Sequence, residues 1–135
     1  MKKVSLLILG VILLVIIFVS VKPKTKLTYE TTAIQIGTTT ITAEIADTKK
    51  KRGLGLSGRS TLPADRGMLF IFDQPNKHGF WMKDMNFPLD IVWFDKNRTI
   101  VGITKNLQPN SYPQIFYPPQ EIVSALEINT GLISF

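Results

Sequence analysis

The sequence predicts a mainly β domain, a small closed or half-open β-barrel with one or two short helices, behind an N-terminal transmembrane helix. An uncharged apolar run occupies residues 4–21. After it, many short apolar runs alternate with turn residues, a pattern typical of small barrels and sandwiches. The chain has no cysteine, which excludes a disulfide framework, a thiol nucleophile and a thiolate metal site.

The apolar run at residues 4–21 is flanked by lysines at positions 2, 3, 22, 24 and 26. A helix of this length covers about 27 Å, close to the hydrocarbon thickness of a bilayer. Signal cleavage requires small residues near the end of the run, but Phe18 precedes the only one, Ser20. We therefore expect an uncleaved single-pass anchor in the cell membrane, with residues 1–3 in the cytoplasm and the domain outside it. The alternative is a protein secreted after signal cleavage.

Residues 22–32 are polar and predict an extended tether, so residues 33–135 form the domain. The formal charge of the whole chain is +6. Residues 1–26 hold five lysines and no acid, whereas residues 27–135 hold eleven basic and ten acidic side chains. Because the domain is nearly neutral, the composition argues against a nucleic-acid partner.

The first half of the domain predicts a hairpin and a short helix. Residues 33–37 and 39–46 are rich in Thr and Ile with alternating polarity, and Gly37 and Thr38 between them are typical of a hairpin turn. Asp47 and Thr48 offer capping oxygens for a helix at residues 49–54. Glycines at positions 53, 55 and 58 keep this helix short.

The second half predicts five strands. Residues 68–72 form a continuous apolar run, and residues 80–82 form a shorter one. The runs at residues 89–94 and 99–104 flank the polar sequence 95–98, which predicts a second hairpin. A loop with four prolines spans residues 106–119, and a last strand is predicted at residues 121–128.

The domain also resembles a known family along residues 34–131. The resemblance begins with Arg52, the Gly-Leu step at residues 55–56 and Arg59. It continues with Gly-Met-Leu-Phe at residues 67–70, Phe-x-Met-Lys at residues 80–83 and Pro-Leu-Asp-Ile at residues 88–91, and it closes with Glu127 and Gly131. This pattern resembles the domain of unknown function numbered 192, also called uncharacterised protein family 0127. The resemblance implies a compact, mainly β fold, often behind a signal or anchor, with no established activity.

At its C-terminus this sequence departs from the usual pattern of the family. Relatives usually continue past the final glycine into a short helix and one more strand, whereas this sequence stops at Phe135. We therefore expect the last helix and strand of the family to be missing, which would leave an exposed sheet edge.

Asp90 is the most unusual charged residue, because it lies within the apolar run LDIVWF. A buried carboxylate needs partners, and we expect Arg59 or, second, Arg52 to supply them as a structural latch. Alternatively, Arg59, Asp90 and Glu127 line a pocket for a polar ligand, with arginine as a planar donor.

Aromatic side chains and the lone histidine complete the candidate site. Alternation places Phe80 and Met82 on one face and Trp81 on the other. One set packs in the core and the other can lie at the surface, where Trp81 would bind a sugar, peptide or partner protein. Core packing alone is the favoured account for most of these aromatic side chains. The loop with Tyr117 forms either an aromatic wall beside that face or only a stiff connector. His78 is the only histidine, so a His-pair metal site is excluded; it can act as a general base or be an exposed loop residue.

Three functions remain open from the sequence. The first is a membrane-anchored binding module for an envelope carbohydrate or peptide, and the second is an accessory partner of another envelope protein. The third, an envelope hydrolase using Asp90 or Glu127 with His78, is less favoured because no nucleophile motif is present. We assign no catalytic residue, metal or cofactor. The candidate ligand-binding residues are Arg52, Arg59, His78, Trp81, Asp90, Tyr117 and Glu127.

Overall fold

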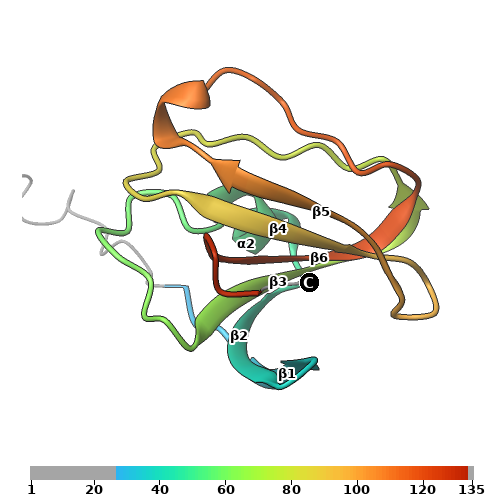
Figure 1. The fold of residues 1–135 in the computed structure, drawn as a ribbon. Helices are drawn as coiled ribbons and strands as arrows, with labels where there is room; N and C mark the ends of the chain where they lie inside the picture. The colour runs from blue at the N-terminus through green and yellow to red at the C-terminus, as the bar shows by residue number, and fades with distance from the viewer. Residues whose placement is uncertain (1–26, 134–135) are drawn as a thin grey trace, which may run out of the picture.

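The computed structural model describes residues 27–133, and its strands form one six-stranded sheet (Figure 1). The strand order is β1-β2-β3-β6-β4-β5, with β1 and β5 at the two ends. The sheet is therefore open, and the predicted mainly β fold is confirmed without closure of a barrel. The elements are β1 (Thr31–Ile36), β2 (Thr39–Ala46), α2 (Lys49–Leu54), β3 (Arg66–Asn76), β4 (Leu89–Phe94), β5 (Ile100–Leu107), the 3-10 helix η1 (Pro109–Ser111) and β6 (Ile122–Asn129).

The predicted anchor at residues 4–21 lies outside the described residues. Within residues 27–133, no helix has the length and apolar character needed to cross a membrane.

The predicted hairpin and helix at residues 33–54 are confirmed. β1 and β2 pair in antiparallel register around Gly37, whose φ of +58° favours glycine. α2 begins after Thr48, whose Oγ1 accepts a 3.2 Å hydrogen bond from the backbone N–H of Lys51. It ends at Gly55, where φ is +53°.

The second hairpin is confirmed as β4 and β5. Asp95 organises its turn, because its Oδ1 accepts hydrogen bonds from the backbone N–H groups of Asn97 at 2.8 Å and Thr99 at 2.9 Å. Arg98 in the same turn has a φ of +62°. The predicted strand at residues 80–82 is wrong beyond its first residue, because only Phe80 forms a β-bridge, to Phe116.

The strand pairing contains two features that the sequence analysis did not predict. β2 and β3 are parallel, and α2 lies in the crossover that a parallel pair requires. β6 is paired on both sides, with β3 and β4, although it is the last strand within residues 27–133. The open sheet edges belong to β1 and β5 instead. The expected loss of a further helix and strand stays a prediction.

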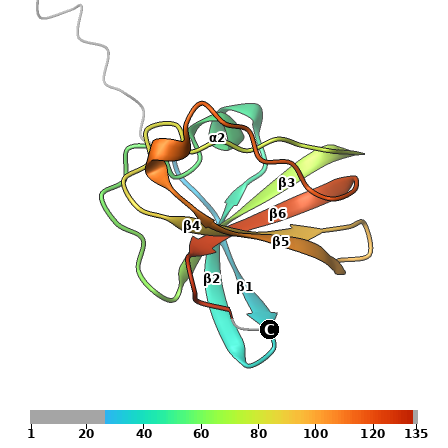
Figure 2. The same ribbon diagram turned by 45° about the horizontal axis from the view of Figure 1, so that its top comes forward.

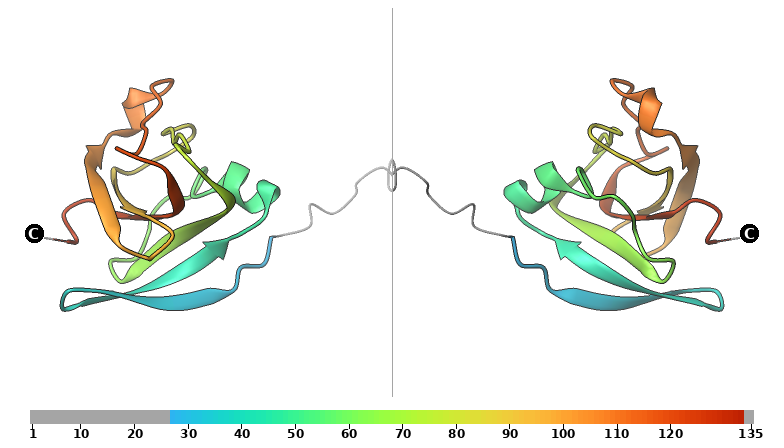
Figure 3. Two further views of the ribbon diagram at one scale, coloured as in Figure 1. Left: turned by 90° about the vertical axis from the view of Figure 1, so that its right-hand side faces the viewer. Right: turned by 90° about the vertical axis from the view of Figure 1, so that its left-hand side faces the viewer.

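Both faces of the sheet are covered, so β4 is buried along its whole length. Figure 2 and Figure 3 show α2 and the long connections on one side of the sheet, with the β1–β2 hairpin curled on the other. The core on the α2 side includes Leu56, Met68, Phe70, Phe80, Met82, Ile91, Trp93 and Ala125. The core on the opposite side includes Ile41, Ala43, Val92, Phe94, Leu126 and Ile128.

Candidate functional site

Glu127 lies in the centre of the sheet, in register with Met68 of β3 and Ile91 of β4. Its side chain shares the α2 side with these two fully buried residues. Glu127 is only 6% exposed, and its Oε2 atom is enclosed without a hydrogen-bond partner among the described residues. A buried oxygen without a partner is costly, which makes this carboxyl the first candidate for a functional group.

Burial controls the protonation state of Glu127. Loss of hydration raises the pKa of this carboxyl to about 8, although the positive charge of Arg59 lowers it in part. The acid is therefore mostly neutral at pH 7, and it can donate a hydrogen bond from its O–H as well as accept one.

A cavity of about 310 Å³ opens beside Glu127, between α2 with its following turn and the segment around Phe80. Aromatic rings and other apolar groups dominate its wall, and Lys49 and Arg52 contribute the positive charges. The apolar lining residues are Leu54, Leu56, Phe70, Phe72, Phe80, Trp81 and Met85. The combination of apolar walls with one carboxyl is typical of small-molecule sites.

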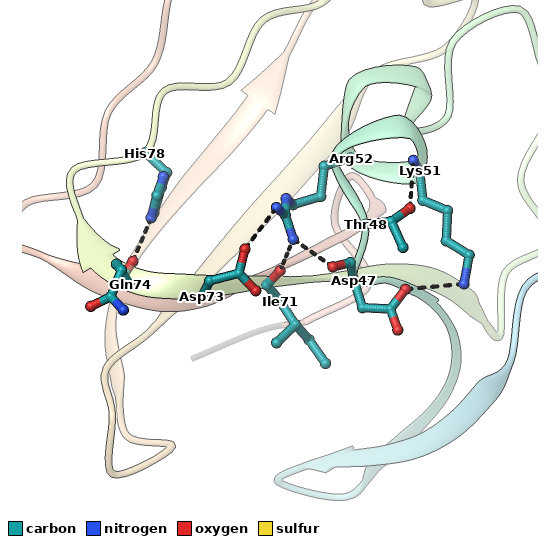
Figure 4. A network of polar contacts seen from close by, with 8 residues as sticks. All are labelled: Asp47, Thr48, Lys51, Arg52, Ile71, Asp73, Gln74 and His78. Carbon is teal, nitrogen blue, oxygen red and sulfur yellow. Dashed lines mark hydrogen bonds and ion pairs between the residues drawn. The ribbon is translucent and has the colours of Figure 1, made fainter.

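Arg52 lines this cavity, and its guanidinium already makes hydrogen bonds within the protein (Figure 4). Its Nη1 donates 2.7 Å hydrogen bonds to the backbone oxygens of Asp47 and Ile71, and its Nη2 lies 3.3 Å from the carboxylate of Asp73. These contacts join α2 to the end of β2 and to β3. Arg52 therefore shapes the cavity more than it offers a free charge to a ligand.

His78 supports the cavity from behind one of its aromatic walls. Its ring stacks on Phe72 with a centroid separation of 3.6 Å and an interplanar angle of 7°. Its Nε2 donates a 2.9 Å hydrogen bond to the backbone oxygen of Gln74 (Figure 4). His78 does not itself line the cavity. The geometry thus assigns it a packing contact rather than a proton-transfer contact.

Trp81 lies at the mouth of the cavity and is 51% exposed, while Phe80 and Met82 on either side are buried. The predicted separation of these side chains onto two faces is found, although residues 81–82 are not in a strand. Trp81 packs edge-to-face against Tyr112, with ring centroids 6.0 Å apart. Tyr117 is also exposed and crosses over Gly79, where a Cβ would lie 2.8 Å from Tyr117 Cε1. The proline-rich loop therefore extends the aromatic surface beside the mouth.

Asp90 is buried, as predicted, but the predicted pairing with Arg59 or Arg52 is wrong. The Asp90 carboxylate accepts hydrogen bonds from the backbone N–H of Asn106 at 2.7 Å, the hydroxyl of Thr130 at 2.8 Å and the backbone N–H of Gly131 at 2.9 Å. These donors lie on β5 and just after β6. Asp90 is a latch within the fold, with neutral partners in place of a guanidinium.

Arg59 instead pairs with Glu44 of β2. Its Nη1 and Nη2 lie 2.9 Å and 2.6 Å from the two carboxylate oxygens, a bidentate contact that lowers the pKa of Glu44 through hydrogen bonding. Arg59 also lies over the ring of Tyr29, 5.7 Å from its centroid. All three residues line a second, more open hollow of about 780 Å³, which shares the turn at Leu54 and Gly55 with the first cavity.

The predicted network of Arg59, Asp90 and Glu127 is therefore not assembled. Asp90 is in register with Ile128, whereas Glu127 is in register with Ile91, and these two isoleucines belong to opposite cores. The two carboxyls consequently point to opposite faces of the sheet. Within residues 27–133, no group of three or more His, Asp or Glu side chains is placed to hold a metal ion.

Comparison with known proteins places this fold in a family. Residues 31–134 match DUF192, described as "Uncharacterized ACR". The chain belongs to the DUF192 family. No curated protein matches it. This DUF192 domain is similar to the crystal structure of a candidate transcription regulator from Sinorhizobium meliloti 1021, with 29% identity, a TM-score of 0.70, and coverage of 79% of this chain and 86% of that chain.

A second solved structure has a similar fold. The domain is similar to the crystal structure of a protein of unknown function from Novosphingobium aromaticivorans DSM 12444. The identity is 27% and the TM-score 0.71, with coverage of 84% of this chain and 81% of that chain. The match of residues 31–134 to DUF192 confirms the predicted resemblance to this family of unknown function.

Sequence analysis of this DUF192 domain missed Glu44 and the aromatic wall formed by Phe70 and Phe72. Glu44 carried little signal, because β2 alternates polar and apolar residues and a carboxylate fits its polar face, unlike Asp90 in a wholly apolar run. Phe70 and Phe72 are two residues apart on β3, so their side chains lie on the same face of the strand, and both line the cavity. This spacing allows a shared aromatic wall but does not by itself predict a cavity.

Proposed function

We propose that this protein is a membrane-anchored binding module, held outside the cytoplasm, for an envelope carbohydrate or peptide. The 18 uncharged residues at positions 4–21 support the anchor, and the polar tether that follows supports display of the domain near the membrane surface. An accessory contact with another envelope protein is compatible with the same arrangement.

The observation that carries the proposal is the unpartnered carboxyl of Glu127 beside an aromatic cavity. A ligand group that hydrogen bonds Glu127 would offset the cost of its burial. The half-exposed indole of Trp81 at the mouth supplies a flat surface for the remainder of the ligand.

The hydrolase alternative receives less support from the geometry. Asp90 and Glu127 point to opposite sides of the sheet, and the three hydrogen bonds to Asp90 occupy its carboxylate. His78 is stacked on Phe72 and bonded to a backbone oxygen. Support for an enzyme would require a turnover that is lost on His78→Ala or Asp90→Asn.

A nucleic-acid partner is also disfavoured. The similar protein from Sinorhizobium meliloti is described as a candidate transcription regulator. In this chain, however, the eleven basic side chains of residues 27–135 are nearly balanced by ten acidic ones. A domain that binds phosphate backbones ordinarily carries a strong basic excess on one face.

The test is a ligand screen on the full-length protein in phospholipid nanodiscs. Saturation-transfer NMR would compare a panel of envelope glycan fragments and short peptides. We expect a bound ligand whose signal is lost in Trp81→Ala and in Glu127→Leu. Ile71→Ala is the matched control, because this exposed side chain of β3 lies outside the cavity. A ligand unaffected by both cavity variants would contradict the proposed site.

A further inference from the structure

We infer that Glu127 receives the uncharged acetamido group of an N-acetylated sugar, whose ring packs on Trp81. The inference rests on the proposed binding function and specifies the chemistry of the ligand. Both residues line the same cavity, one buried beside it and one half-exposed at its mouth.

The carboxyl of Glu127 determines the head group of the ligand. Surrounded by Met68, Ile91 and the cavity wall, it has little stabilisation for a negative charge. The protonated acid presents one O–H donor and one carbonyl acceptor side by side. A carboxamide presents the matching N–H donor and carbonyl acceptor, so the two groups can form paired hydrogen bonds.

A cationic ligand fits this cavity poorly. Lys49 and Arg52 already line it, and Arg59 acts on Glu127 from the neighbouring hollow. The carboxylates near these cations are engaged, since Asp73 contacts Arg52 and Glu44 contacts Arg59. A buried ammonium would therefore have only an ionised Glu127 as its partner and three cations as neighbours.

An anionic ligand fits poorly for a different reason. The guanidinium of Arg52 already donates to two backbone oxygens and to Asp73, and Lys49 is exposed. A carboxylate or phosphate moved beside Glu127 would lose its hydration without gaining a buried cation. An uncharged group avoids both costs.

The aromatic mouth favours a sugar ring as the body of the ligand. A pyranose has an apolar C–H face and polar edges, which suits a half-exposed indole such as that of Trp81. Tyr112 holds this indole by an edge-to-face contact, so the platform is supported before a ligand arrives. A cavity of about 310 Å³ has room for one ring with its substituent.

The experiment uses the full-length protein in phospholipid nanodiscs with four matched probes, in saturation-transfer and competition NMR. N-acetylglucosamine carries the amide, glucose a hydroxyl and glucosamine an amine on the same ring, and N-acetylphenylalaninamide carries amides without a sugar. We expect N-acetylglucosamine to bind about tenfold more tightly than each other probe, as loss of a well-made buried hydrogen bond predicts.

Variants and pH then assign the contact to Glu127. The charged groups on the elements around Glu127 are Lys49, Arg52 and Arg59. The hydrogen bond to Glu44 raises the pKa of Arg59. Between pH 6.5 and pH 9, affinity should fall about tenfold as the acid loses its proton. Glu127→Gln should keep binding without this pH dependence, because its amide is also a donor and acceptor.

The remaining variants and outcomes separate the inference from the proposed function. Glu127→Leu and Trp81→Ala should lose N-acetylglucosamine, while Ile71→Ala keeps it, and circular dichroism checks that each variant is folded. Equal binding of glucose would overturn the amide contact, and binding of N-acetylphenylalaninamide alone would overturn the sugar. If no probe binds, the inference is wrong, whereas a different panel ligand lost in both cavity variants would leave the proposed function standing.

Discussion

The carboxylate of Asp90 accepts a 2.7 Å hydrogen bond from the backbone N–H of Asn106, where β5 is irregular and φ is +56°. The same carboxylate accepts hydrogen bonds from Thr130 and Gly131 after β6. One buried side chain thereby satisfies donors from two segments that the regular ladder leaves unpaired. The latch joins the edge strand β5 to the turn that ends the central strand.

Asp90→Ala should lower the free energy of unfolding by roughly 3 kcal/mol, because it leaves buried donors without an acceptor. Urea denaturation followed by the fluorescence of the fully buried Trp93 measures the change. Asp95→Ala in the exposed turn is a carboxylate control with a smaller expected cost. An unchanged midpoint for Asp90→Ala would contradict the latch.

Glu127 should make stability depend on pH. Because its pKa is raised from 4.5 to about 8 by folding, the folded state holds a proton that the unfolded state releases. Its favourable contribution is fully present below pH 4.5 and is lost as the pH rises to about 8. The loss is on the order of several kcal/mol.

Glu127→Gln removes this titration and is the matched variant. Its unfolding midpoint in urea should vary less between pH 5 and pH 9 than that of the unchanged protein, and it should be the more stable of the two at pH 9. Parallel pH profiles for both proteins would show that Glu127 titrates normally, against the expected result.

Arg59 and Glu44 should be energetically coupled, since they form a bidentate pair that is only partly exposed. A double-mutant cycle with Arg59→Ala and Glu44→Ala should give a coupling of about 1 kcal/mol at pH 7. Because folding lowers the pKa of Glu44, the coupling is present above pH 4.5 and is lost as the carboxylate is protonated at lower pH.

The same variants test the pairing that the sequence suggested for Arg59. The effects of Arg59→Ala and Asp90→Ala should add, because the two side chains have separate partners. A coupling between them larger than that with Glu44 would restore the original pairing.

Residues 4–21 should remain attached to the mature protein, because the run is long and lacks small residues suited to cleavage. N-terminal sequencing of protein purified from membranes should begin at or near Met1. A new N-terminus near residue 22 would establish the secreted alternative. The proposed function would then be that of a secreted binding module without a membrane anchor.

Several local elements were predictable because their causes lie within a few residues. Thr48 and Gly55 set the ends of α2, and the turn chemistry of Gly37 and Asp95 sets the two hairpins. Alternation predicted that Phe80 and Met82 share a face opposite Trp81, but tertiary packing decided which face is buried, since residues 81–82 are not in a strand. Burial of Asp90 was predictable, since five apolar residues surround it in its strand.

The sequence by itself determined the mainly β class, the hairpins, the helix and the family, because periodicity, capping and motif order are properties of neighbouring residues. Only the tertiary structure decided the parallel β2–β3 pair, the central place of β6 and the partners of Asp90 and Arg59. These contacts join segments far apart in the chain, so no local pattern specifies them. The cavity at Glu127 exists for the same reason, because residues of α2, its following turn, β3 and the segment around Phe80 meet around a carboxyl on β6.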